Sequence, residues 1–370
     1  MTTVFTRKAS YDYDSLKPVV FDLLDNTIPG LIKQQSRVLI KPNLLLPAAP
    51  EKGILTHPMI VKATAEYVLN KKGIPLISDS PAIGSFDKII DAGGYRDALE
   101  DLNVEFKEFR QSVKVDTGEP FGLIDLAQDA VDADIIISLP KLKTHTQMLL
   151  TMGIKNMFGC VVGLKKPEWH FKTGIDRSMF ARLLVNIYKA VKPAVTLVDG
   201  ILALEGQGPG KRGTPRELGI LIAGQNAAAV DMTICSMLGV SPEKLSTNIE
   251  AKNAGIVDGR LYIQGDFPLI SGFKIPEPGP LIFGPEPLHK LMRRHLLQRP
   301  VVDRQLCDVC AKCWQYCPAK AIYRSAKQIT FDYNRCIRCY CCIEICPKGA
   351  IQATETIPGK ILKIFRILEN

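Results

Sequence analysis

Two copies of one cysteine pattern lie between residues 307 and 351, and this segment holds nine of the chain's eleven cysteines. The first copy reads C-x2-C-x2-C-x3-C and is followed by Pro318; the second repeats the spacing and is followed by Pro347. Three thiolates two residues apart on a tight loop reach three corners of one iron–sulfur cube, and the fourth cysteine points to the other cube. The spacing therefore predicts two [4Fe-4S] clusters.

This crossed arrangement divides eight cysteines into two ligand sets and resembles the bacterial two-cluster ferredoxins. We assign Cys307, Cys310, Cys313 and Cys346 to cluster one, and Cys336, Cys339, Cys342 and Cys317 to cluster two. Cys341 has no place in the pattern and is expected to be a bystander. Cys160 and Cys235 lie in apolar surroundings and are expected to be buried small residues.

Other uses of the cysteines fit the sequence less well. Zinc sites prefer two separated cysteine pairs, whereas this segment has triplets with a proline-capped fourth member. A disulfide framework needs an oxidising compartment. The N-terminal stretch "MTTVFTRKASYDYD" lacks the apolar core of a signal peptide, so a cytoplasmic location is expected.

Composition and charge narrow the function classes further. The 370 residues are 46% hydrophobic and 23% charged, which is typical of a globular chain of two or three domains. No apolar run reaches the ~18 residues of a membrane helix. The formal charge of +9 falls to about +5 once two oxidised clusters with their thiolates are counted. No basic stripe or motif indicates nucleic-acid binding. The excess suits an anionic small-molecule substrate and a soluble, acidic electron carrier of low potential.

Apolar strand patterns alternate with helical patterns over the first 260 residues. Strands are expected near 37–40, 74–80, 132–143, 194–200 and 218–224, and helices at 57–73, 178–192 and 227–238, the first of them capped by Thr56. This alternation predicts an α/β fold with a mostly parallel sheet flanked by helices, followed by a small ferredoxin-like α+β module. The expected domains are 1–263 (α/β), 264–300 (a Pro/Gly-rich linker or strap with a short basic helix at 289–299), 301–356 (the cluster module) and 357–370 (a tail).

Polar side chains follow several of the expected strands, where ligands of α/β sheets collect. The candidate substrate-binding residues are Lys41, Asn43, Lys141, Lys143 and Asn156, and the candidate catalytic residues are His145 and Lys155. Lys141, Lys143 and His145 alternate and so share one face of an extended chain, where they need an anion or a negatively charged partner; the alternative is a solvated basic edge. His145 titrates near neutrality, and a buried Lys155 could act as a base or nucleophile or could pair with an aspartate. We expect one pocket, open toward the cluster module, with Trp169 or His170 near its mouth.

An ordered set of short motifs carries a family resemblance. "KPNL", "THP", "SDSP", "LPKLKTH", "GIKNMFG", "VDG" with "EGQGPG", and "AAAVD" occur in that order between residues 35 and 240. Together they resemble the family known as domain of unknown function 362, whose members often end in a double-cluster segment. The acidic residue that the family carries before the "AVD" helix is Asn226 here. The resemblance implies a fold and a redox- or metal-linked role.

Three functions fit these features. In the first, the chain is a ferredoxin-linked oxidoreductase that passes electrons through its clusters to a substrate or second cofactor in the α/β domain. In the second, it is an electron-transfer or assembly subunit that docks a partner. In the third, it is a lyase or isomerase with structural clusters. We favour the first, because a pure carrier needs only the last sixty or so residues. Whether a flavin, nucleotide or extra metal binds the α/β domain is left open.

Overall fold

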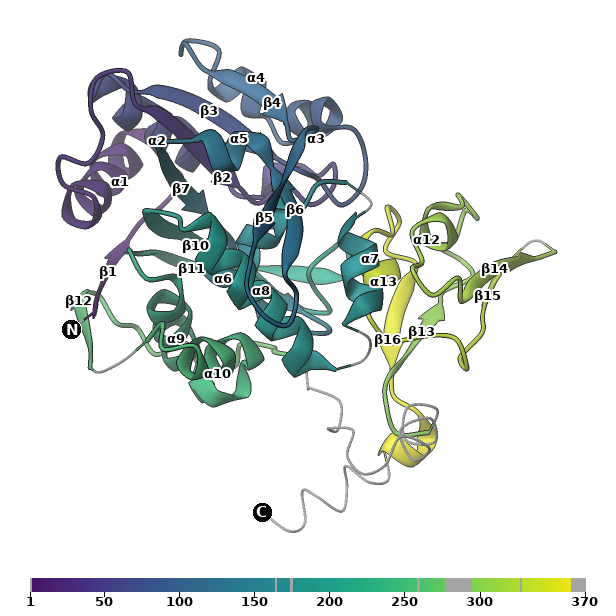
Figure 1. The fold of residues 1–370 in the computed structure, drawn as a ribbon. Coiled ribbons are helices and arrows are strands. Elements are labelled where there is room, and N and C mark those ends of the chain that lie inside the picture. Colours follow the sequence, from purple (N-terminus) through teal and green to yellow (C-terminus); the bar gives the residue numbers. More distant parts are fainter. Residues whose placement is uncertain are drawn as a thin grey trace.

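The structure is a computed structural model that describes residues 2–163, 165–173, 176–257, 260–276, 295–326 and 328–360 (Figure 1). Its helices are α1 (Tyr13–Thr27), α2 (Pro58–Asn70), α3 (Phe86–Ala92), α4 (Tyr95–Ala98), α5 (Gln128–Asp132), α6 (Gly153–Asn156), α7 (Lys165–Lys172), α8 (Arg177–Val191), α9 (Ala227–Met237), α10 (Ser246–Asn253), α12 (Lys312–Gln315) and α13 (Cys341–Glu344). Its strands are β1 (Thr2–Lys8), β2 (Arg37–Pro42), β3 (Ile74–Asp79), β4 (Glu105–Glu108), β5 (Ser112–Asp116), β6 (Leu123–Ala127), β7 (Ile135–Leu139), β8 (Lys141–His145), β9 (Leu149–Thr151), β10 (Val195–Gly206), β11 (Gly213–Gly224), β12 (Leu261–Gly265), β13 (Arg299–Val302), β14 (Ile322–Ser325), β15 (Gln328–Phe331) and β16 (Ile351–Thr354).

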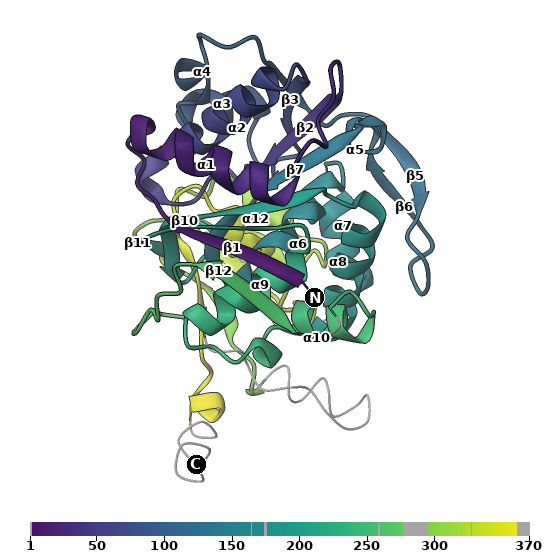
Figure 2. The ribbon, with the colours of Figure 1, turned by 90° about the vertical axis from the view of Figure 1, so that its left-hand side faces the viewer.

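A ten-stranded sheet forms the α/β domain, in the order β12-β1-β11-β10-β7-β2-β3-β4, with β8 paired to β10 and β9 paired to β8. All neighbours along the main path are parallel except β11, which runs antiparallel to β1 and β10. Helices α1 and α2 cover one face, and α8, α9 and α10 cover the other (Figures 1 and 2). The expected α/β class with a mostly parallel sheet is confirmed.

Local signals explain where two of the expected elements differ from the structure. Helix α2 is capped by the side chain of His57, which accepts from the backbone N–H of Met59, so the prediction of Thr56 as the cap was wrong. The hydroxyl of Thr56 instead donates to the carbonyl of Leu139. The single strand expected over 132–143 is divided into β7 and β8, because Pro140 lies between them and offers no N–H to a sheet ladder.

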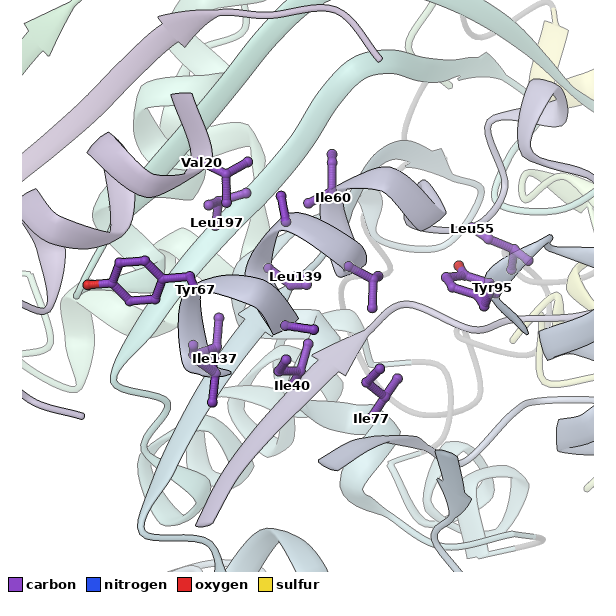
Figure 3. Packing of buried hydrophobic residues seen from close by; sticks show 14 of the residues in the cluster. Val20, Ile40, Leu55, Ile60, Tyr67, Ile77, Tyr95, Ile137, Leu139 and Leu197 are labelled. Carbon is purple, nitrogen blue, oxygen red and sulfur yellow. The ribbon is translucent and has the colours of Figure 1, made fainter. Parts of the chain in front are cut away.

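Branched apolar side chains fill the layer between the sheet and helices α1 and α2. Figure 3 shows part of this core, in which residues of β2, β7 and β10 meet residues of the two helices: Ile40, Ile137, Leu139, Leu197, Val20, Ile60 and Tyr67. Each of them is at most 1% exposed, so each aliphatic side chain contributes about 1.5–3 kcal/mol by burial. This packing fixes the strand ends on which the site is built.

The C-terminal module is a pair of two-stranded sheets with one short helix in each cysteine motif. Strands β13 and β16 pair antiparallel, as do β14 and β15, and the module lies beside α7 of the α/β domain (Figure 1). The expected basic helix at 289–299 falls mostly on residues 277–294, outside the described residues. The predicted domain boundaries stay predictions. No helix in the described ranges has the length and apolar character needed to cross a membrane.

Candidate functional site

A cavity of about 70 Å³ lies between the α/β domain and the cluster module. Its α/β side is formed by the ends of β2 and β3 and by the segment from α6 to α7, and its module side by residues of the two cysteine motifs. The polar lining residues are Lys41, Asn43, Asp79, Ser80, Lys155, Asn156, Lys166 and His170 on the first side and Tyr316, Cys341 and Glu344 on the second. Four of the seven candidate residues therefore line one cavity: Lys41, Asn43, Lys155 and Asn156.

Lys41 and Asp79 form a buried ion pair at the carboxyl ends of the adjacent strands β2 and β3. The Lys41 Nζ and Asp79 Oδ1 atoms are 2.9 Å apart, and both side chains are less than 5% exposed. The carboxylate also accepts from the backbone N–H groups of Leu44 and Ser80. A Cβ at position 159 would collide with both charged groups, so Gly159 permits the close approach of this wall. Lys41 is thus charge-compensated, which the sequence prediction did not anticipate.

Lys155 adds a second positive charge to the cavity lining, and no carboxylate among the described residues forms an ion pair with it. Its ammonium makes no hydrogen bond or ion pair within the described ranges, and it reaches the cavity from α6. Burial lowers its pKa, while the charges of Glu344 and Cys341 act in the opposite direction. Lys166 donates to the carbonyl of Ser80 at 2.5 Å, and burial lowers its pKa to about 8. The cavity lining therefore holds three lysines against two carboxylates.

Lys143 lies one layer behind the cavity wall. Its ammonium donates to Asn43 Oδ1 at 2.7 Å and to the carbonyl of Ile54 at 2.8 Å. The Asn43 amide donates in turn to Asn156 Oδ1 at 3.2 Å. Burial, followed by the charge of Lys155, lowers the pKa of Lys143 to about 7. The expectation that Lys143 lines the pocket was wrong: its ammonium orients Asn43 instead.

His145 also lies outside the cavity and contacts the cluster module. Its Nδ1 accepts from the backbone N–H groups of Gln147 and Met148, both at 3.1 Å, so the ring proton is on Nε2. Nε2 lies 2.6 Å from Oε1 of Glu344. Burial, then the charge of Lys155, lowers the pKa of His145 to about 4, so the imidazole is neutral at pH 7. The prediction that His145 lines the pocket was therefore wrong. His145 instead contacts the carboxylate of Glu344, which does line the cavity.

Lys141 belongs to a separate, fully buried network. Its ammonium contacts Asp199 Oδ2 at 2.7 Å and the Tyr11 hydroxyl at 2.8 Å, and that hydroxyl donates to Asp199 Oδ1. The Tyr11 ring stacks on His57 at 3.6 Å between centroids. Lys141 is therefore not a cavity residue, because strand β8 aims it at the paired residue Asp199 on β10.

Of the two aromatic residues expected near the pocket mouth, His170 lines the cavity and Trp169 does not. His170 lines the cavity, is 4% exposed, and its Nδ1 has no hydrogen-bond partner in the described part of the chain. Its ring stacks on Phe180 at 4.3 Å. Burial lowers its pKa to about 3. Trp169 instead packs edge-on against Phe121, away from the cavity.

The structure brings the cysteines of each predicted crossed set near one another. Burial raises the pKa of Cys313 to about 12, and the thiols that add to this are those of Cys346, Cys310 and Cys307. A second cavity is lined by the other set, Cys317, Cys336, Cys339 and Cys342. The residues present thus fit two [4Fe-4S] clusters, one from each crossed set.

The two motif loops also share their backbone geometry. Left-handed φ values occur at Val309 and Ala311 in the first loop and at the corresponding Arg338 and Tyr340 in the second. Backbone N–H groups donate to equivalent sulfurs, from Ala321 to Cys317 and from Ala350 to Cys346. This internal symmetry is what two clusters in equivalent cradles need.

Cys341 lies in the wall between the two cavities. It lines both the interdomain cavity and the cavity of the cluster-two cysteines, and it is 3% exposed. Its thiol is hydrogen-bonded to the sulfur of Cys339, a cluster-two ligand. The expectation that Cys341 is a bystander overlooked this position, because the residue stands outside the cysteine spacing.

Two glycines of "EGQGPG", Gly208 and Gly210, permit close packing of neighbouring backbone segments. A Cβ at Gly208 would meet the backbone of Thr144, and one at Gly210 would lie 2.8 Å from the carbonyl of Glu344. The Arg212 guanidinium, just beyond, donates to the carbonyl of Gly349 in the module. The loop therefore clamps the cluster module against β8.

Sequence reasoning did not select Asp79, Lys166, Tyr316 or Glu344, although all four line the cavity. Asp79 stands in the motif "SDSP", and that motif at a strand end was the available signal. Glu344 stands within "CCIEIC", where the cysteines dominate the pattern. Asn226, the departure from the family motif, caps α9 by accepting from Ala228 and Ala229.

Comparison with known proteins places both parts of the chain. The family described as "Domain of unknown function (DUF362)" matches residues 38–236, and a 4Fe-4S dicluster domain matches residues 299–347. A thylakoid-associated protein of Synechocystis sp. is 38% identical over 252 residues, which are 68% of this chain and 78% of that protein.

Two further relatives match less of the chain. The delta subunit of NADH-dependent phenylglyoxylate dehydrogenase from Aromatoleum evansii is 42% identical over 50 residues, which are 14% of this chain and 54% of the subunit. The lactate racemase apoprotein from Thermoanaerobacterium thermosaccharolyticum is 13% identical with a TM-score of 0.41, over 61% of this chain and 55% of that one. A likeness of that size carries no argument about the reaction.

Proposed function

Because this chain belongs to the domain of unknown function 362 family and ends in an electron-transfer module with two [4Fe-4S] clusters, we propose that it passes electrons to a small molecule held in the interdomain cavity. The position of Cys341 carries the proposal. A guest in the cavity would touch a residue that also lines the cavity of the cluster-two cysteines. The clusters, when bound, supply one-electron transfer.

The residues around the cavity have separable tasks under this proposal. Lys155 attracts and holds the negative charge of the guest. The Lys41–Asp79 pair and the Asn43–Asn156 pair keep the α/β wall rigid, since each member is hydrogen-bonded. Glu344 and Cys341 are buried on the module side, so little of their surface is in contact with bulk water.

The burial of several cavity-lining side chains favours this proposal over a subunit that only docks a partner. A docking surface needs exposed side chains, whereas Lys41, Asn156 and His170 are at most 4% exposed. Glu344 belongs to the cysteine motifs and at the same time completes the wall of the cavity. The lining thus depends on both domains, which a carrier that exchanges electrons at its surface does not require.

A reoxidation experiment tests the proposal. The full-length protein is reduced under anaerobic conditions, freed of reductant, and mixed with small reducible anions such as nitrite, sulfite and glyoxylate, while the visible absorbance of the clusters is followed. We expect at least one of them to reoxidise the wild-type protein more than tenfold faster than Lys155→Met, with Lys172→Met as the exposed control. Equal rates in all three proteins for every anion would reject the proposal in favour of a docking subunit.

A further inference from the structure

Two nitrogen atoms of the cavity lining have no hydrogen-bond partner within the described residues. They are Nζ of Lys155, whose side chain is half-buried, and Nδ1 of His170, whose side chain is 96% buried and can donate from Nδ1 when the ring proton is there. A buried polar atom without a partner costs free energy, so a guest that accepts hydrogen bonds is favoured there. On the module side, Oε1 of Glu344 lies 2.6 Å from Nε2 of His145, although neither atom has an aligned hydrogen-bond partner within the described residues.

The side chains that line the cavity include one more positive than negative group. Lys41, Lys155 and Lys166 stand against Asp79 and Glu344, which leaves a formal charge of +1. Lys41 and Asp79 neutralise each other at 2.9 Å, so the excess lies toward Lys155 and Lys166. Uncompensated charge in a buried site is costly, and one monoanion would remove it.

The size of the cavity limits the guest sharply. A volume of about 70 Å³ is more than the ~10–15 Å³ that holds one water molecule, so there is room for a small guest. Pockets for drug-sized ligands and cofactors span about 300–1,000 Å³. A flavin or a nucleotide is therefore too large for this cavity.

We propose that this cavity is a binding site for a small monoanionic carboxylate or oxyanion, held by Lys155 Nζ and His170 Nδ1 beside the Cys341 thiol. The inference rests on the proposed function for the choice of site, but binding itself transfers no electron. It can therefore be tested on the oxidised protein with no reductant present.

Calorimetric titration of the oxidised full-length protein tests the inference, with formate, acetate and nitrate as probes and citrate as an oversized anion. We expect one small anion per chain and no heat from citrate. Lys155→Met should weaken formate binding about 10- to 100-fold, because a charge-assisted hydrogen bond is lost, and His170→Phe about three- to tenfold. Lys172→Met removes the same charge from an exposed position on α7 and should leave binding unchanged.

The wild-type protein supplies a second measurement that needs no variant. Formate should slow the acylation of Lys155 by acetic anhydride and leave that of Lys172 unaltered, as measured by peptide mass spectrometry. Absence of formate binding, equal weakening in Lys172→Met, or formate that fails to protect Lys155 would each overturn the inference. Binding without reoxidation would instead remove the proposed function and leave the anion site standing.

Discussion

The Nε2 atom of His145 lies 2.6 Å from Oε1 of Glu344, and this contact joins strand β8 of the α/β domain to helix α13 of the cluster module. Burial alone would raise the pKa of Glu344, but His145 and Lys155 outweigh it and lower that pKa to about 2. Neither of the two atoms has an aligned hydrogen-bond partner among the described residues, so the contact is a close approach of a neutral imidazole to an ionised carboxylate. The contact therefore fixes one wall of the cavity.

We predict that His145→Phe lowers the thermal unfolding midpoint of the protein. The variant removes the polar group that the buried Glu344 carboxylate faces, which costs about 1–3 kcal/mol. Glu344→Gln keeps a polar oxygen facing Nε2, so its effect should be smaller. Anaerobic calorimetry of both variants would measure this, and a larger loss in Glu344→Gln than in His145→Phe would contradict the assigned contact.

The Lys41–Asp79 pair predicts strong non-additivity. Lys41→Met leaves a buried carboxylate without its cation and should destabilise the fold by about 3–5 kcal/mol. The double variant Lys41→Met, Asp79→Leu removes both charges, so it should be more stable than the sum of the two single changes predicts. Denaturant unfolding of the four proteins gives the coupling, and additive losses would show that the two side chains do not interact.

His170 predicts a specific loss of stability in acid. Burial holds its folded pKa at about 3, below the ordinary value of 6.5, so the unfolded chain takes up the proton first as the pH falls. The contribution is fully present above about pH 6.5 and is lost progressively toward about pH 3. Between about pH 7 and about pH 5, the wild-type protein should lose about 2 kcal/mol more than His170→Phe. If the unfolding midpoints of the wild-type protein and of His170→Phe changed with pH in the same way, this prediction would be refuted.

The crossed cysteine sets predict which cluster a single substitution removes. Cys346→Ser should destroy cluster one, although its neighbours in sequence ligate cluster two. Iron analysis should fall from two cubes to one, and electron paramagnetic resonance of the reduced protein should retain the signal that Cys336→Ser removes. Cys341→Ser should keep both clusters. Loss of the same cluster in Cys346→Ser and Cys336→Ser would disprove the crossed arrangement.

The extent to which the sequence predicts this molecule depends on whether the signal is local. Cysteine spacing and strand–helix alternation are local patterns, and they predict the two clusters and the mostly parallel sheet. Lys41 and Asn43 could be chosen because polar residues at strand ends gather at one edge. The buried partner of Lys141 is Asp199 on another strand, and that of His145 is Glu344 in another domain. Residue spacing in the sequence does not reveal such long-range pairs. The sequence prediction therefore placed Lys141 and His145 in the pocket, whereas in the structure each contacts its partner outside the pocket lining.

The central claim is that a ligand in the interdomain cavity lies against Cys341, which also lines the cavity of the cluster-two cysteines. The most direct test is pulsed electron paramagnetic resonance of reduced Cys307→Ser protein, which lacks cluster one, with bound ¹³C-formate. The account predicts a ¹³C hyperfine coupling to the remaining cluster that disappears when Lys155→Met is added and persists with Lys172→Met. A cluster-two spectrum without ¹³C coupling, or a coupling that survives Lys155→Met, would contradict it.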